Sequence, residues 1–494
     1  MPLWLENNHV DNNIFRGDFV LEQKIYTQLE KNKETIKSFF GQSADYFEKD
    51  IMILGHRAAI VMCEDLTNIT NLWQVNLKPL NNLKSDFTPN EVYDYISGQT
   101  TIPFNSQPAE TFEKIMFFLT AGFSVILIDG VDKALVAPVQ GYPARSISAP
   151  EAEGSLRGTR ESFCDTGRKN MALIRRRVRS EGLVIETVQV GEVTKTEITL
   201  YYHTAYCDMD MVKKVKERLE KIDIPIVTES GFIAPFIDTT KGSLFSAVSY
   251  TEKPDVLSAK ICEGKIGIMA DGCPFALIYP FLFTEHFYTS DDYSQRPYFV
   301  SFIKMLRYIA FLISVMLPGL YISLANFAPH NLPYKLIHFI FESKNSTPLP
   351  LFAEAIIIVI IFEIIKEAGL RMPKAIGHTV SFVAALIIGD AAVNAGLIGS
   401  AVLIVCAVST IMAFVVPSFY EATIILRVIF LLCSGISGAI GFAFATVFLV
   451  LNIISVDSGE WQYTPALSVY NIKKLKDIFL KSSWRTLNKE YHDK

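Results

Sequence analysis

The stretch "YIAFLISVMLPGLYISLANFA", Tyr308 to Ala328, separates two regions of different composition. It has the length of a membrane-spanning helix, which needs about 20 mostly apolar residues, and Lys304 and Arg307 precede it. Upstream, charges are dense and apolar runs are short, whereas long apolar stretches dominate downstream as far as Ile454. The sequence therefore predicts a soluble region followed by a membrane region, with the boundary near Pro297.

The composition of the whole chain agrees with this division. The 494 residues have a mean hydropathy of +0.28 and a formal net charge of −5, which favours membrane insertion and argues against a nucleic-acid partner. Seven scattered cysteines without CxxC spacing argue against disulfides and zinc, and no motif indicates a cofactor. The N-terminus, "MPLWLENNHVDNNIF", lacks the features of a secretory signal, so we expect the soluble region to lie in the cytoplasm.

Three pairs of strands are predicted in the soluble region, each with a turn between two apolar runs. They lie in "IMILGHRAAIVMCED" from Ile51, "FSVILIDGVDKALVAPV" from Phe123 and "GKIGIMADGCPFALIYP" from Gly264. The Asp-Gly pairs in the last two are strong hairpin signals, and amphipathic helical patterns lie between the pairs. The predicted fold is an α+β membrane protein with two small α/β subdomains, 1–150 and 151–297, ahead of a multi-span α-helical domain.

A basic helix is predicted from Phe163 to Arg179, with a buried stripe of Met171, Ile174 and Val178. Its arginines include three that fall on one line and one beside them; these are Arg168, Arg175, Arg179 and Arg176. One interpretation is a basic interface for lipid phosphates or for an acidic partner surface. The other is a helix whose charges form salt bridges, and the spacing leaves both open.

The membrane domain, 298–456, is predicted to have four to six spans, and Pro318 should kink the first. The apolar run from Ala422 to Ile454 would be about 50 Å long as one helix, far more than a ~30 Å bilayer core. It should break within its cluster of small residues, Ser434, Gly435, Ser437, Gly438 and Gly441. Basic residues in the tail, 457–494, place both termini inside and require an even number of crossings.

One predicted span, Ile376 to Ile398, carries an aspartate near its centre. At about 100° per residue, one face is polar at both ends and apolar between; its residues are Thr379, Val383, Leu386, Asp390 and Asn394. A separate ridge of small residues suits close helix packing and comprises Ser381, Ala385, Gly389, Ala392 and Gly396. Either Asp390 lines an aqueous path, or it is buried against Arg427, His378 or a backbone donor.

Two further intramembrane acids, Glu354 and Glu363, lie about 180° apart on one helix, so at most one can face a given path. Glu363 has Lys366 nearby as a partner for a structural role.

Several long motifs in order resemble the A subunit of spore germination receptors, the GerA family, from about Tyr26 to Ile454. They are "RGTRESF", "NMALIRRRV", "TEKPD", "EGKIGIMADGCP", "LPGLYIS" and, above all, "KEAGLRMPKAIGHTVSFVAALIIGDAAVNAGLIGS". The sequence departs from the family at Thr159 and Ser162, where proline and glycine are common, and at His378 and Asp390, where glutamine is usual.

The resemblance implies the A subunit of a nutrient receptor in the spore inner membrane, multi-pass, with both termini on the spore core side. It implies a transporter-like B subunit and a lipoprotein C subunit as partners, and a homo-oligomer of A subunits that forms a nutrient-gated ion channel. In that arrangement the face of Asp390 would line the pore.

Three alternatives stay open beside the channel. An ion-coupled transporter would use the intramembrane acids, although no inverted repeat is visible. A membrane scaffold would only hold partners. An enzyme is disfavoured because no HxxxH, GxSxG or phosphate-loop motif is present, so no catalytic residue is predicted.

Overall fold

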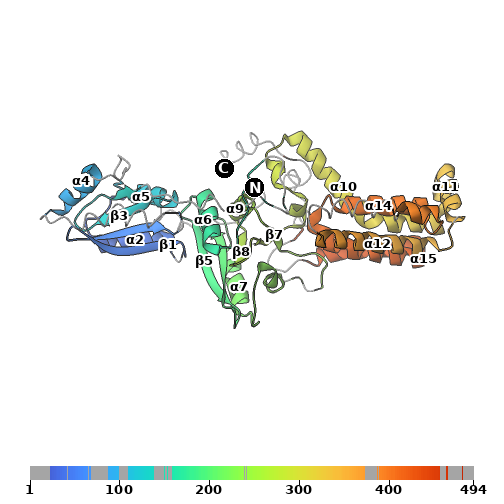
Figure 1. Cartoon of the computed structure of the whole chain (residues 1–494), viewed down its shortest axis with the longest axis horizontal. Coiled ribbons are helices and arrows are strands. Elements are labelled where there is room, and N and C mark those ends of the chain that lie inside the picture. The colour runs from blue at the N-terminus through green and yellow to red at the C-terminus, as the bar shows by residue number, and fades with distance from the viewer. Residues whose placement is uncertain are drawn as a thin grey trace. The chain divides into compact units, whose positions relative to one another are not determined.

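The structure is a computed structural model that describes most of the chain: residues 23–41, 43–64, 66–67, 87–99, 109–137, 150, 153, 158–238, 240, 242–345, 347–372, 387, 389–456, 463–464 and 481. It consists of two compact units (Figure 1). The first, the soluble unit, comprises Met1–Thr239 and Val248–Phe281. The second, the helical unit, comprises Thr240–Ala247 and Leu282–Lys494. The chain therefore crosses from one unit to the other three times.

The soluble unit begins with a four-stranded antiparallel sheet in the order β1-β2-β3-β4. Its strands are β1 Tyr46–Ile53, β2 His56–Cys63, β3 Ser124–Ile128 and β4 Leu135–Ala137. A two-residue turn, Leu54 and Gly55, joins β1 to β2 with positive φ at both positions, as type I′ hairpins require. Gly130 follows β3 with φ +90°, so this predicted hairpin is confirmed, although its connection is longer.

Both faces of this sheet are covered, because successive side chains of a strand point to opposite faces. Helices α2 Leu29–Phe40 and α5 Phe112–Thr120 pack on the face that presents Ala59, Val61 and Val125. Helix α4 Pro89–Gln99 packs through Val92 and Ile96 on the other face, against Ile60 and Ile126. The two faces explain the near-continuous apolar runs in β2 and β3.

A five-stranded antiparallel sheet follows, in the order β5-β6-β8-β9-β7. Its strands are β5 Leu183–Val190, β6 Thr196–His203, β7 Ser249–Thr251, β8 Ile266–Ala270 and β9 Ala276–Tyr279. Helices α6 Gly167–Arg177 and α9 Pro254–Cys262 cover one face. Helix α7 Met209–Glu220 contacts β5, where Lys216 pairs with Glu186. The short helix α8 Ala234–Ile237 precedes β7.

The helical unit is built from long apolar helices that lie side by side (Figure 1). Its main helices are α10 Pro297–Ile322, α11 Tyr334–Asn345, α12 Leu351–Arg371, α14 Ser400–Ala413 and α15 Tyr420–Ile454. Helix α10 contacts both α14 and α15, and α12 contacts the same two helices. Their shared core is aliphatic and includes Ile322, Ala355, Val402, Cys406 and Leu431.

Helix α15 breaks where the cluster of small residues predicts it. Gly438 has φ +58° and ψ −128°, which is non-helical. The rings of Phe430 and Phe442 are 5.4 Å apart, whereas twelve residues of straight helix would separate them by about 18 Å. The chain therefore reverses at Gly438, and each half of the helix, 420–437 and 439–454, is about 25 Å long. Only glycine tolerates this backbone without strain, and the Phe327 ring occupies the place where a Cβ would stand.

Two stretches, Pro297–Phe327 and Pro417–Ile454, are long and apolar enough to cross a membrane, with hydropathies of 1.9 and 2.2. The predicted fold class is thus confirmed as an α/β region with two sheets followed by a helical region with two candidate spans. The number of four to six crossings stays a prediction.

Candidate functional site

The described end of the Asp390 span, residues 389–394, is helical and closes with a glycine. Gly396 has φ +64°, the amide of Leu397 donates to the carbonyl of Ala392 at 3.0 Å, and the amide of Gly396 donates to the carbonyl of Val393 at 3.0 Å. This hydrogen-bond pair is a Schellman motif, which ends a helix sharply. The short connection from this segment to α14 follows from it.

The two predicted faces of this span differ in exposure. Asp390 and Asn394 are exposed, whereas Gly389 is buried, and a Cβ at Gly389 would lie 3.5 Å from Leu403 of α14. Ala392 and Gly396 are half-buried. The small ridge thus packs toward α14 while the polar residues point away from it. Thr379, Val383, Leu386, Ser381, Ala385 and the proposed partner His378 lie outside the described residues.

Glu354, in the first turn of α12, is fully buried and already satisfied. Its Oε1 accepts from the Thr347 hydroxyl at 2.6 Å, and its Oε2 accepts from the amide of Gly399 at 2.8 Å. Gly399 is the N-cap of α14, so the carboxylate sits where the helix dipole favours negative charge. Glu354 therefore anchors the turn between the Asp390 segment and α14.

Arg427 of α15 is, like Glu354, a fully buried charge of the helical unit. Pro318 has no amide hydrogen, so the carbonyl of Ser314, four residues earlier in α10, has no helical donor from it. That carbonyl accepts from Arg427 Nε at 3.0 Å and from Ser409 Oγ at 2.8 Å. The Arg427–Ser314 node thus joins α10, α14 and α15, and only the fourth-residue spacing before Pro318 signals it in the sequence.

Glu363 of α12 completes this node. Arg427 Nη1 lies 3.6 Å from Glu363 Oε1, and the Tyr420 hydroxyl donates to Glu363 Oε2. The ammonium of Lys366 lies over the ring of Tyr420, so Glu363 takes Arg427 and Tyr420 as partners in place of Lys366. Arg427 is therefore not the partner of Asp390. Within the described residues, the side chain of Asp390 makes no hydrogen bond or ion pair.

In the soluble unit, the predicted basic helix exists but is shorter than expected. The Asn170 side chain bonds both backbone groups of Cys164, at 2.9 and 2.6 Å, which holds the preceding residues as a loop, and α6 starts at Gly167. Met171, Ile174 and Val178 are buried, as their spacing predicts.

Arg175 of α6 does not lie on an exposed basic face, because it is completely buried. It makes a bidentate ion pair with Asp45, from Nε at 2.6 Å and from Nη2 at 2.9 Å, and it also bonds the Ser43 hydroxyl and the Ser180 carbonyl. The amide of Ala44 donates to Ile185 of β5 at 2.6 Å. This Arg175–Asp45 lock therefore joins the first sheet to the second.

The other predicted basic residues are partly paired. Nη2 of Arg176 donates to both carboxylate oxygens of Glu161, at 2.7 and 2.8 Å, and Arg177 bonds the same carboxylate. Burial alone would raise the pKa of Glu161, but the two guanidinium groups outweigh it and lower that pKa. Arg168 and Arg179 are exposed. The interface prediction therefore remains for these two arginines.

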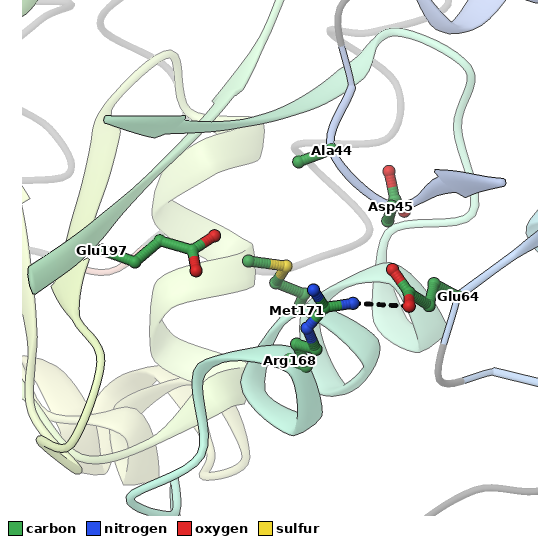
Figure 2. Close-up of a pocket in the computed structure, with 6 residues that line it drawn as sticks. All are labelled: Ala44, Asp45, Glu64, Arg168, Met171 and Glu197. Carbon is green, nitrogen blue, oxygen red and sulfur yellow. Dashed lines mark ion pairs between the residues drawn. The ribbon is translucent and has the colours of Figure 1, made fainter. Parts of the chain in front are cut away.

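A small pocket lies beside the Arg175–Asp45 lock (Figure 2). Its volume is about 30 Å³, and Arg168 and Glu64 form an ion pair at its wall, with Glu197 facing them across the pocket. This space holds about one water molecule. It is too small for a nutrient molecule. The part of the chain that the structure describes contains no group of three His, Cys, Asp or Glu side chains placed to hold a metal ion.

Comparison with known proteins gives consistent matches along the chain. The profile of the Bacillus/Clostridium GerA spore germination protein family matches residues 34–492. Spore germination protein KA of Bacillus subtilis (strain 168) is 32% identical over 467 residues, which cover 93% of this chain and 85% of that protein. Spore germination protein B1 of the same strain is 30% identical over 462 residues, covering 93% of this chain and 95% of that protein.

One solved structure is also similar: the crystal structure of the N-terminal domain of the A subunit of the Bacillus megaterium spore germinant receptor GerK3. It matches 53% of this chain and 98% of its own, with 26% identity and a TM-score of 0.41.

Proposed function

This chain belongs to the Bacillus/Clostridium GerA family of spore germination proteins, and from that premise we propose that it is the A subunit of a nutrient receptor that opens an ion path during germination. Its role is in spore germination, as in its relatives. The proposed location is the spore inner membrane, as a multi-pass protein with both termini on the spore core side. The proposed partners are a transporter-like B subunit, a lipoprotein C subunit and further copies of the A subunit.

The observation that carries the ion path is the contrast among the three acids of the helical unit. Glu354 and Glu363 are held by internal partners, which gives each a structural role. Asp390 is exposed on a segment whose other side packs on α14. A carboxylate at mid-membrane costs roughly 2.5 to 3.5 kcal/mol to insert, so it needs protein or water around it. An oligomer in which this face surrounds water supplies that environment.

In this proposal, copies of the chain place Thr379, Val383, Leu386, Asp390 and Asn394 around a common path. A ring of carboxylates attracts cations, and an apolar layer at Val383 and Leu386 forms a constriction that can exclude water. In this proposal the soluble unit receives the signal of a nutrient bound elsewhere in the receptor, and the pocket beside the Arg175–Asp45 lock is too small for such a ligand. The chain itself performs no catalysis.

The test is potassium and dipicolinate release after addition of nutrient to spores that carry Asp390→Asn or Asp390→Leu. We expect altered release kinetics with an unchanged amount of the subunit in the inner membrane. Glu421→Gln is the matched control, because Glu421 is an exposed acid of the same unit that is outside the proposed path. Unchanged release in both Asp390 variants would remove this span from the ion path.

Two measurements, one on the same spores and one on the purified chain, separate the alternatives. If Asp390 variants change the assembly of the receptor but not its release kinetics, the chain is a scaffold. If the purified chain in vesicles catalyses saturable solute uptake without ion current, it is a transporter subunit.

A further inference from the structure

A short segment, Thr240–Ala247, belongs to the helical unit although the residues on both sides of it belong to the soluble unit. It leaves after α8 and returns at β7. No motif in the sequence distinguishes this segment. Its interactions with the helical unit are specific, and they involve both ends of α15.

Two neighbouring strands of the second sheet border the places where the chain passes into the helical unit. The segment Thr240–Ala247 precedes β7, and the second passage follows β9. Ser249, the first residue of β7, pairs with Ile278 near the end of β9. Phe245 stands four residues before Ser249, and Phe283 stands four residues after Tyr279, the end of β9. The rings of Phe245 and Phe283 are 5.8 Å apart. Two hydrogen-bonded strands of the sheet thus continue into two segments, Thr240–Ala247 and the β9 extension to Phe283, which we call the two arms. Their phenylalanine rings contact each other in the helical unit.

The rings of Phe245 and Phe283 contact two further phenylalanines. These are Phe311 of α10 and Phe419, which immediately precedes α15. Phe245 lies 6.4 Å from Phe311 and 5.4 Å from Phe419 between ring centroids, and Phe283 lies 6.1 and 5.1 Å from the same rings. Phe245, Phe311 and Phe419 are each at least 96% buried. Every ring of this four-phenylalanine cluster contacts the other three, because Phe311 and Phe419 are 5.1 Å apart.

Hydrogen bonds hold the segment Thr240–Ala247 to Asn452, near the C-terminal end of α15. The amide of Leu244 donates to Asn452 Oδ1 at 3.0 Å, and the Ser243 hydroxyl lies 3.1 Å from the same oxygen. Because α15 reverses at Gly438, Asn452 and Phe419 lie at the same end of the hairpin. The segment therefore contacts Asn452, near the end of α15, and Phe419, immediately before its start.

The cluster also adjoins the Arg427–Ser314 node. The Ser314 hydroxyl donates to the carbonyl of Phe311 at 2.8 Å, one turn from the cluster. The Ser314 carbonyl binds Arg427 and Ser409 of α14, and α14 packs against Gly389 of the Asp390 segment. Contacts are thus continuous from the two arms to the helix next to Asp390.

We propose that the two arms, Thr240–Ala247 and the β9 extension to Phe283, form the mechanical link by which the soluble unit opens or closes the ion path. A change in the β7–β9 edge of the sheet displaces both phenylalanines together, because the strands are hydrogen-bonded to each other. The cluster then shifts α10 against α15, and the Arg427–Ser314 node passes the shift to α14. This proposal rests on the proposed ion path and adds its regulation.

The test uses spores that carry Phe245→Ala, Phe245→Leu or Ser243→Ala in the complete receptor. Phe236→Ala is the matched control, since Phe236 of α8 is 41% exposed. We expect Phe245→Ala and Ser243→Ala to slow nutrient-triggered potassium release about fivefold or more, as is typical of a lost coupling energy, with the subunit present at its normal level. Phe245→Leu retains most of the buried volume and should give a smaller effect.

A double variant distinguishes coupling from general damage. If Phe245 acts through Phe311, Phe245→Ala/Phe311→Ala should slow release by much less than the product of the two single effects. If Phe245→Ala lowers the subunit level, Ser243→Ala decides, because it removes only hydrogen bonds. Wild-type release in Phe245→Ala and Ser243→Ala spores at normal subunit level would overturn the link. The proposed ion path itself would be rejected by a different result, namely unchanged release in the Asp390 variants.

Discussion

Arg175 and Arg427 are both completely buried, one in each unit, and they are stabilised in different ways. Arg175 faces a carboxylate that is 3% exposed and binds it through two nitrogens. Arg427 faces a carboxylate only at 3.6 Å, and its closest acceptor is the Ser314 carbonyl at 3.0 Å. One guanidinium is neutralised by an ion pair, whereas the other is solvated mainly by backbone.

The difference follows from what each unit offers. A loop ahead of β1 brings Ser43 and Asp45 to α6, because loop residues are free to present side chains inward. Helices bond their own carbonyls, so a buried arginine among them finds an acceptor where a proline has released one. The ion pair of Arg175 and Asp45 thus joins the two sheets, whereas the node joins its helices mainly through hydrogen bonds to backbone carbonyls.

The largest expected effect is in the soluble unit. Arg175→Met leaves Asp45 buried without its partner, and loss of one member of a buried pair costs about 3 to 5 kcal/mol. Urea unfolding of the full chain in detergent micelles, followed by hydrogen exchange in β1 and β5, should show this loss. The double variant Arg175→Met/Asp45→Leu removes both charges and should recover most of it. An equal loss in the double variant would contradict the role assigned to the pair.

A smaller loss is expected at the node. Arg427→Met removes a donor from the Ser314 carbonyl, which costs about 1 to 3 kcal/mol, and the heat stability of the chain in detergent should report it. The sharper comparison uses a Pro318→Ala background, in which residue 318 regains an amide hydrogen for that carbonyl. Arg427→Met should then cost less. If the cost is the same in both backgrounds, the released carbonyl is not what holds Arg427.

Glu354 offers a finer test within the helical unit. Glu354→Gln keeps an acceptor for Thr347 or Gly399 but removes the charge at the start of α14, so we expect a loss of about 0.5 to 1 kcal/mol. Heat stability in detergent measures it, with Glu421→Gln as the exposed control. A loss of stability as large as that of Arg427→Met would contradict this expectation. It would mean that the node depends on the charge of Glu354.

The smallest effect is a pH dependence confined to the soluble lock. His203 accepts from the amide of Ala205 and lies 2.9 Å from the hydroxyl of Ser180, whose carbonyl binds Arg175. Burial first, and then the charge of Arg175, lowers the pKa of His203 below its ordinary 6.5.

The folded state therefore favours neutral His203, and this contribution to stability is complete above pH 6.5. It falls as the pH decreases from there toward the lowered pKa, because the unfolded chain takes up the proton first. Denaturation of the wild type and of His203→Gln at neutral and mildly acidic pH measures the slope. A His203→Gln variant with an unchanged slope would assign the pH dependence to another group.

Local patterns in the sequence were sufficient for several features. The hairpin turns at Gly55 and Gly130, the buried stripe of Met171 and Ile174, and the break of α15 at Gly438 follow from backbone preference and from periodicity. The different exposure of Gly389 and Asp390, which lie about 100° apart on one helix, follows in the same way. Each of these depends on residues a few positions apart.

Partners that are far apart in the chain were not predictable. Helical spacing put Arg175 on a basic face with Arg168 and Arg179, but it could not show that Asp45, 130 residues away, would cover it. Proximity in one membrane region offered Arg427 as one possible partner of Asp390, whereas packing gave Arg427 the Ser314 carbonyl and Glu363.

Hydropathy, turn chemistry and glycine were enough to predict a soluble region of two α/β subdomains, the long apolar helices and the break in α15. Which charges are buried depends on tertiary packing, and so does the convergence of Phe245 and Phe283 on Phe311 and Phe419. The reason is physical. Burial and pairing depend on which surfaces pack together, and strand order and helix contacts set those distances rather than separation along the chain.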